Sequence, residues 1–194
     1  MKLVVIDYGA GNVQSVKYAL NRLGVAATLS NDPEVISGAD KLLFPGVGAA
    51  NAAMESLKEN KLDQLIPLLK QPFLGICLGM QLMCKHSEEG GTQALNIIDS
   101  EVVKFKGNEK IPHMGWNNLS AVQTQLFKGV DIAQQVYFVH SYFVPKNQYT
   151  IASCDYMGNF SAAIQKDNFY AVQFHPEKSG AVGELILKNF IELI

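Results

Sequence analysis

The sequence predicts an α/β fold, with a mostly parallel central sheet, flanking helices and an antiparallel extension. Two observations predict the parallel part: short apolar runs rich in branched residues recur in the first half of the chain, and segments of helical periodicity separate them. A third observation predicts the extension. After residue 100, β-branched and aromatic runs follow one another with only turn-like residues between them. Without a repeat or a clear linker, residues 1–194 are interpreted as a single domain.

The first half begins with a strand at Lys2–Tyr8, whose unbroken apolar run is typical of a strand buried on both faces. A tight loop at Gly9–Asn12 follows. Asn12 can cap a helix whose apolar positions recur at helical spacing until Gly24 ends it. The next expected elements are a strand at Val25–Leu29, a short helix from Asp32-Pro33, a strand at Lys41–Phe44, a helix at about 49–58, a strand at Phe73–Ile76 and a helix at Leu78–Lys85.

The second half predicts antiparallel strands that extend or flank the parallel sheet, and then a closing helix at about Gly180–Leu193. The expected strands are Glu101–Phe105, Val136–Val144, Tyr149–Asp155, Ser161–Gln165 and Tyr170–Phe174. In parallel sheets, binding sites lie at the carboxyl ends of the strands. Chemistry is therefore expected at the loop Gly9–Asn12, at the loop Pro45–Gly48 and at the turn around Cys77.

Composition narrows the class of protein. Of the 194 residues, 48% are hydrophobic and 18% charged, and the formal net charge of −2 gives no basic field for nucleic acid or an anionic membrane. The N-terminal apolar run is too short for a signal peptide, so a cytoplasmic location is expected. Cys77, Cys84 and Cys154 form no regular framework, and the four histidines are scattered. We therefore expect no disulfide scaffold, no metal and no cofactor.

Cys77 stands between an expected strand and an expected helix, with Gly75 and Gly79 on its two sides. A nucleophile on such a sharp turn is pushed out above the sheet edge, and small neighbours leave room for it. The helix start favours the thiolate, and the backbone N–H of Leu78 can face a developing oxyanion. A buried core cysteine is the commoner fate of a free thiol. Cys84 and Cys154 fit that interpretation, whereas the paired glycines set Cys77 apart.

His175-Pro176-Glu177 closes another expected strand. Side chains two positions apart on an extended chain point the same way, so Glu177 can hold one imidazole nitrogen and leave the other for a nucleophile. Alone, this stretch would be interpreted as a surface histidine beside a solvated carboxylate. Paired with the glycine-flanked Cys77, it predicts a catalytic triad.

Two segments, Gly-Ile-Cys-Leu-Gly-Met-Gln at 75–81 and His-Pro-Glu at 175–177, resemble the catalytic motifs of class I, triad-type glutamine amidotransferases. Further segments are similar to the glutaminase subunits of imidazole glycerol phosphate synthase, which serve histidine biosynthesis: 5–12, 45–48, 112–117, 137–142 and 173–180. The resemblance spans nearly the whole chain. Ala50 and the stretch 94–96 depart from the family pattern, outside the triad.

The resemblance implies a flavodoxin-like α/β fold and glutamine hydrolysis by Cys77, His175 and Glu177. It implies that the N–H of Val47 joins that of Leu78 in an oxyanion hole. Glutamine-binding positions are implied at Gly48, Gln81, Ser141 and Tyr142. For Ser141 and Tyr142, an ordinary alternating strand explains the pattern nearly as well.

The resemblance also implies a partner, a (β/α)8-barrel cyclase subunit in a heterodimer. It would receive ammonia through a channel and make imidazole glycerol phosphate and an aminoimidazole carboxamide ribotide. Ammonia would be protonated and lost in bulk water, so its consumer should dock directly on this domain. Glycines on both sides of Val47 would let docking realign the oxyanion loop. The expected contact residues are Asn12, Met114, Trp116, Asn117 and Tyr137.

Other classes of function stay open at this point. Gly9 and Gly11 after the first strand, with Asp32 further on, partly match a dinucleotide-binding fingerprint, but Gln14 replaces its third glycine. A cysteine hydrolase or peptidase can use a similar nucleophile turn. A catalytically silent binding subunit is the third alternative, and the complete triad argues against it.

Overall fold

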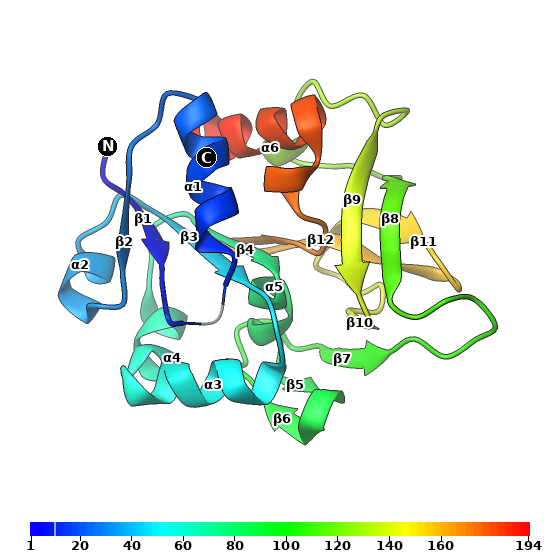
Figure 1. Cartoon of the computed structure of the whole chain (residues 1–194), viewed down its shortest axis with the longest axis horizontal. Helices are drawn as coiled ribbons and strands as arrows, with labels where there is room; N and C mark the ends of the chain where they lie inside the picture. Colours follow the sequence, from blue (N-terminus) through cyan, green and yellow to red (C-terminus); the bar gives the residue numbers. More distant parts are fainter. Residues whose placement is uncertain (10) are drawn as a thin grey trace.

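The computed structural model describes residues 1–9 and 11–194. Ala10, in the loop expected at Gly9–Asn12, lies outside the described residues. The main sheet has seven strands in the order β11-β12-β13-β4-β3-β1-β2 (Figure 1). Their bounds are β1 Leu3–Ile6, β2 Ala27–Ser30, β3 Lys41–Gly46, β4 Phe73–Cys77, β11 Thr150–Asp155, β12 Asn159–Lys166 and β13 Phe169–Val172. The predicted α/β fold is confirmed.

Helices cover both faces of this sheet. Figure 1 shows α1 and α6 over one face and α3, α4 and α5 over the other. No helix in the described part of the chain has both the length and the apolarity needed to cross a bilayer. The helices are α1 Val13–Arg22, α2 Pro33–Ser37, α3 Ala50–Glu59, α4 Leu62–Leu65, α5 Leu78–Leu82 and α6 Gly180–Leu193, with 3-10 turns at Ile66–Leu68, Glu89–Gly91, Gln125–Phe127 and Pro176–Lys178.

Strand β1 shows why its sequence is apolar throughout. Leu3 and Val5 point to the core shared with α1 and α6, whereas Val4 and Ile6 point to the core shared with α3 and α5. All four side chains are almost fully buried. The expectation of a strand buried on both faces is confirmed, and Asn12 caps α1 as expected by accepting a hydrogen bond from Ser15 N at 3.3 Å.

The last strand corrects one expectation. Tyr170–Phe174 was expected among antiparallel strands, and β13 does pair antiparallel with β12, but it pairs parallel with β4 on its other side. The reason is that the β12–β13 hairpin turns the chain back along the direction of β4. In this register Val172 lies opposite Ile76, so the residues after both strands meet at one sheet edge.

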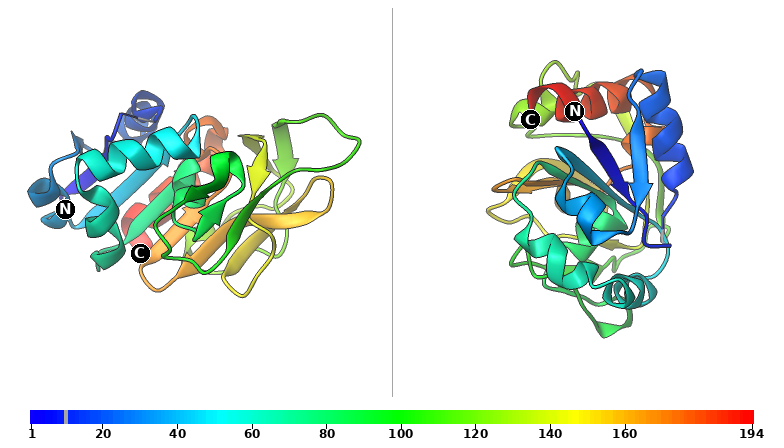
Figure 2. Two further views of the ribbon diagram at one scale, coloured as in Figure 1. Left: turned by 90° about the horizontal axis from the view of Figure 1, so that it is seen from below. Right: turned by 90° about the vertical axis from the view of Figure 1, so that its left-hand side faces the viewer.

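Two small sheets complete the second half. One has the order β10-β7-β5-β6, and the other is the hairpin β8–β9; in Figure 2 (left) these green and yellow segments lie at the opposite end from the blue N-terminal elements. Their strands are β5 His86–Ser87, β6 Thr92–Gln93, β7 Glu101–Lys104, β8 His113–Asn118, β9 Gln135–His140 and β10 Tyr142–Phe143. The strand expected at Val136–Val144 is therefore two, because the chain leaves β8 at Ser141 to pair with β7.

The helix after Cys77 is shorter than expected. It ends at Leu82 rather than at Lys85. The carbonyls of Leu82, Met83 and Cys84 accept hydrogen bonds from the backbone N–H groups of residues 95–98, at 2.9–3.0 Å. These tertiary bonds replace the next helical turn.

Candidate active site

Cys77 ends β4 at a sharp turn into α5. Its backbone has φ +54° and ψ −109°, an unfavourable conformation for a residue with a side chain. The two flanking glycines are needed for packing. A Cβ on Gly79 would lie 1.9 Å from the Phe44 carbonyl oxygen, and one on Gly75 would lie 2.7 Å from Met83 Sδ. The turn that the sequence predicted is therefore built by close contact between α5, β3 and β4.

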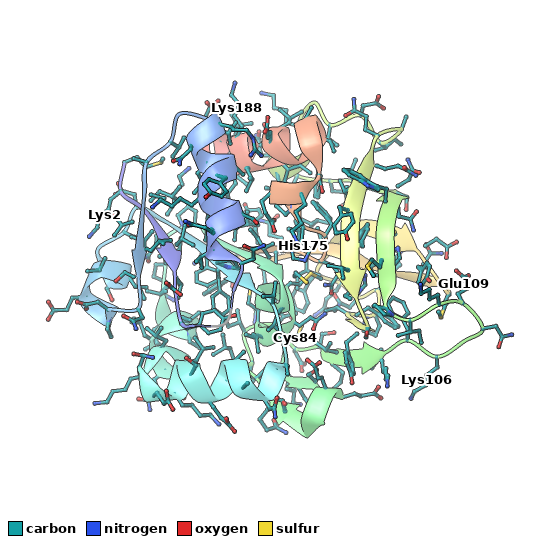
Figure 3. The ribbon with its side chains drawn as sticks, in the orientation of Figure 1. Lys2, Cys84, Lys106, Glu109, His175 and Lys188 are labelled. Atoms are coloured by element: carbon teal, nitrogen blue, oxygen red, sulfur yellow. The ribbon has the colours of Figure 1, made fainter. Side chains whose placement is uncertain are left out.

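His175 follows β13 at the same sheet edge, near the middle of the molecule (Figure 3). Its Nδ1 lies 2.8 Å from Oε1 of Glu177. Both side chains are buried. Within the described residues, Nε2 of His175 and Oε2 of Glu177 have no hydrogen-bond partner. The imidazole is thus held on one side by the carboxylate and keeps its second nitrogen available.

The electrostatics of His175 are set by Cys77 and Glu177. Burial by itself lowers the pKa of His175, because it penalises the charged imidazolium. The neighbouring Cys77 sulfur and the Glu177 carboxylate act in the other direction and raise the pKa to about 10. A protonated His175 can supply a proton to a leaving group.

The backbone of His175 is fixed by β9. His175 N donates to the Tyr137 carbonyl at 2.9 Å. Ser179 Oγ donates to the His175 carbonyl at 2.6 Å and accepts from Tyr137 N at 3.0 Å. Ser179 was not singled out from the sequence, although it lies in the 173–180 segment that carries the resemblance.

A cavity of about 310 Å³ opens beside Cys77 and His175. The structure brings both expected oxyanion residues and all four expected glutamine-binding residues to its wall. The lining residues are Val47, Gly48, Cys77, Leu78, Gln81, Glu89, Pro112, Val139, His140, Ser141, Tyr142 and His175. Glu177 lies behind His175 and lines a second, narrower pocket together with Asn12.

The Gln81 amide is already engaged at the wall of this cavity. Its Nε2 donates to the Tyr142 carbonyl and to Oε1 of Gln173, both at 2.9 Å. Nε2 of Gln173 in turn donates to Cys77 Sγ at 3.6 Å. The sequence reasoning missed Gln173, which stands two positions before His175 and is completely buried. An uncharged polar side chain at a buried strand position was the available indication.

The other cysteines occupy apolar cores. Cys84 and Cys154 are both free and fully buried, which confirms their interpretation as core cysteines. Burial raises the pKa of each thiol to about 12. Among residues 1–9 and 11–194, no group of three or more His, Cys, Asp or Glu side chains is placed to hold a metal ion.

The expected partner contacts fall on the β8–β9 hairpin and beside it. Met114 and Trp116 are 57% and 52% exposed, and the Trp116 ring packs against Tyr137 with centroids 5.8 Å apart. Asn117 points to the opposite, inner face of the hairpin, where its amide donates to the Asp155 carbonyl at 3.0 Å. Asn12 lies near His175 and Glu177 in the narrower pocket.

Comparisons with known proteins give the family. The family model for class I glutamine amidotransferases matches residues 4–193. Over the full length of both chains, this chain is 57% identical to the imidazole glycerol phosphate synthase subunit HisH of Bacteroides fragilis strain YCH46 and 50% identical to that of Escherichia coli K12. The chain belongs to the class I glutamine amidotransferases. Within them it falls among the glutaminase subunits of imidazole glycerol phosphate synthase, as the sequence motifs predicted.

Solved structures support this amidotransferase fold. A glutamine amidotransferase of Thermotoga maritima superimposes with a TM-score of 0.64 at 18% identity, over 100% of this chain and 81% of that one. PurLQS of the same organism gives a TM-score of 0.73 at 14% identity, over 99% and 98% of the two chains. At these identities the likeness concerns the fold alone.

Proposed function

We propose that residues 1–194 form one amidotransferase domain that hydrolyses glutamine to glutamate and ammonia through Cys77, His175 and Glu177. The observation that carries the proposal is the meeting of Cys77 and His175 at the ends of neighbouring parallel strands, beside one cavity. The Glu177 carboxylate 2.8 Å behind the imidazole supports the role of an orienting group. The three free cysteines suit the cytoplasmic location that we propose with this function.

The reaction proceeds in two stages. The Cys77 sulfur attacks the carboxamide carbon, and the backbone N–H groups of Leu78 and Val47 meet the negative oxygen; one such donor typically lowers the barrier by about 2.7–4 kcal/mol. His175 gives a proton to the amide nitrogen as its bond to carbon breaks, so ammonia leaves and a γ-glutamyl thioester remains. His175 then takes a proton from water. The water oxygen attacks the thioester carbon, which releases glutamate and frees Cys77.

The cavity wall suits the polar ends of glutamine. The α-ammonium group needs an acceptor, and Glu89 supplies a carboxylate in the lining. Glu89 Oε2 also accepts from Ala50 N at 2.9 Å, which fixes the position of its side chain. Ser141 and Tyr142, which follow β9, line the same cavity together with Gly48 and Gln81. This arrangement supports recognition of a free amino acid rather than a peptide.

We propose that ammonia passes to a (β/α)8-barrel cyclase subunit, which makes imidazole glycerol phosphate and an aminoimidazole carboxamide ribotide in histidine biosynthesis. The relatives are named as subunits of imidazole glycerol phosphate synthase, which supports a partner subunit. The exposed apolar side chains of Met114 and Trp116 support docking at the β8–β9 hairpin, because such patches mark interaction sites. Val139 of the same hairpin lines the catalytic cavity, so a partner seated there would adjoin Cys77.

Docking would also align the oxyanion loop. Gly48 has φ +99°, a conformation that glycine adopts without strain, and Val47 is 39% exposed. Gly46 and Gly48 carry no side chain that would hinder reorientation of the peptide groups on either side of Val47, and a partner contact can select the orientation that points Val47 N–H at the substrate. Equal glutaminase rates with and without ligand-loaded partner would contradict this part of the proposal.

The test is ammonia release from glutamine with the ligand-loaded cyclase subunit present. Cys77→Ala should abolish release, whereas Cys154→Ala, which removes a buried thiol that does not line the cavity, should retain it. Activity that survives Cys77→Ala would overturn the catalytic assignment. A peptide substrate run in parallel separates the amidotransferase from a peptidase. Capture of a barrel cyclase from native lysate is the check on the pathway.

A further inference from the structure

Two histidines face each other on the inner face of the β8–β9 hairpin. His113 and His140 are a cross-strand pair, and His113 Nδ1 lies 3.1 Å from His140 Nε2. They are only 4% and 6% exposed. The His113 ring is stacked between Phe138 and Tyr156, with centroids 4.8 and 4.0 Å away. The proposed reaction uses neither histidine.

The hydrogen bonds fix the proton on each ring. His140 Nδ1 lies 2.7 Å from the Tyr142 carbonyl, which can only accept, so Nδ1 carries the proton and Nε2 accepts. His113 Nδ1 must then donate to His140. Its Nε2 accepts in turn from Asn117 Nδ2 at 3.4 Å. Burial lowers the pKa of His113 to about 4 and that of His140 to about 3, so both rings stay neutral near pH 7.

The same Tyr142 carbonyl connects this pair to the nucleophile. It accepts a second hydrogen bond from Gln81 Nε2, whose other hydrogen goes to Gln173 Oε1. Gln173 Nε2 in turn donates the last hydrogen bond, to Cys77 Sγ. An unbroken line of hydrogen bonds therefore runs from the inner face of the hairpin, past the cavity wall, to the reacting sulfur.

We propose that His113 and His140 are positioning residues for glutamine hydrolysis, an inference that rests on the proposed function. They hold the Tyr142 carbonyl in place, and with it the backbone of Ser141 and Tyr142 at the cavity wall. Because that carbonyl also orients Gln81, the pair determines how Gln81 and Gln173 present their amides to glutamine and to Cys77. The outer face of the same hairpin carries Met114 and Trp116, so a partner docked there would press on the strands that hold this chain.

The first test is His113→Phe, which keeps a flat ring between Phe138 and Tyr156 but removes the donor to His140. We expect the KM for glutamine to rise about three- to tenfold, as for the loss of one hydrogen bond, with a smaller change in kcat. His113→Asn keeps an amide donor near the position of Nδ1 and should restore KM to within about twofold of the wild type. Asn189→Ala is the control for lost stability. It breaks one buried and one partly buried hydrogen bond, to the Leu126 and Lys128 carbonyls, and none of these three residues lines the cavity.

A second measurement needs no turnover. Alkylation of Cys77 by iodoacetamide, mapped by mass spectrometry with buried Cys84 and Cys154 as internal references, should slow about threefold or more in His113→Phe. In a Gln81→Leu background, His113→Phe should not slow alkylation further, because the line of hydrogen bonds to Cys77 is already interrupted at Gln81. Three outcomes would overturn the proposal. The effects of His113→Phe and Gln81→Leu on alkylation could add, or His113→Phe could leave both KM and alkylation unchanged. The third is an effect of Asn189→Ala as large as that of His113→Phe. If the wild type releases no ammonia, the proposed function fails. The alkylation rates of the single and double variants then decide alone whether His113 and His140 position Cys77.

Discussion

Oε1 of Glu177 lies 2.8 Å from Nδ1 of His175, and each of the two side chains is only 2% exposed. The two residues stand on either side of Pro176, which begins a 3-10 turn. Proline fixes its own φ and favours an extended residue before it, so the pair is held by a short, stiff piece of backbone. The carboxylate reaches the imidazole without a long flexible segment, which keeps the orientation of the ring well defined.

Glu177→Gln tests this relationship. The amide has nearly the same shape but no charge, so it cannot stabilise the imidazolium that forms during proton transfer. We expect kcat for glutamine hydrolysis to fall by about 10²–10⁴-fold, the range seen when a triad loses its charged orienting group. Glu192→Gln, an exposed change near the C-terminus, is the matched control and should leave the rate unaltered. A loss below tenfold would contradict the orienting role.

His175 should titrate far above an ordinary histidine. Its pKa is raised to about 10 by Cys77 and Glu177, against the opposing effect of burial, so the ring should remain protonated at pH 8. Nitrogen-15 NMR of the imidazole measures this directly. Cys77→Ala and Glu177→Gln each remove one of the raising groups, and each should move the titration to lower pH. An imidazole that titrates near pH 6.5 in the wild type would contradict the assignment.

The buried histidine pair predicts loss of stability in mild acid. The folded pKa values of His113 and His140, about 4 and 3, lie below the value of roughly 6.5 in an unfolded chain. Below pH 6.5 the unfolded chain therefore binds more protons, and the free energy of unfolding must fall as the pH decreases. Above pH 6.5 both states are neutral at these sites and the effect vanishes. Urea unfolding between pH 7 and 5 should show this slope, and His113→Phe should make it shallower.

Tyr8→Phe should stabilise the protein. The Tyr8 hydroxyl is buried and has no hydrogen-bond partner within the described residues, and burial raises its pKa above the ordinary range. Removing an unsatisfied buried hydroxyl should increase the free energy of unfolding by about 1 kcal/mol. Tyr156→Phe is the matched control of opposite sign, because the Tyr156 hydroxyl donates to the Lys110 carbonyl. Urea denaturation of both variants measures the difference, and equal shifts would contradict the argument.

The sequence predicted the structure correctly where that structure depends on residues close together in the chain. The unbroken apolar run of β1 predicted a strand buried on both faces. The glycines at 75 and 79 predicted the turn at Cys77, since no larger residue fits between α5 and the sheet. The contact between His175 and Glu177 could be predicted because the two residues are close in the sequence, and their geometry depends on few other residues.

Pairing partners distant in the sequence could not be predicted in this way. The strand β8 contains two asparagines and a glycine, and it is extended because β9 supplies its hydrogen bonds. Gln173 was missed for a related reason. Its contact with Cys77 depends on β13 lying beside β4, a pairing between segments about a hundred residues apart in sequence. The parallel pairing of β13 with β4 could not be predicted for the same reason.

The insertion of β13 between β4 and β12 has a consequence for synthesis on the ribosome. A nascent chain that has emerged only as far as β4 carries Cys77, the proposed nucleophile, but not His175, its proposed base, and one side of β4 is an unpaired sheet edge. The C-terminal segment closes that edge and delivers His175 and Glu177 in the same step. If glutamine hydrolysis requires the proposed triad, the growing polypeptide would gain this activity only after β13 and the residues up to Glu177 have been made, and chains that stop before them would release no ammonia.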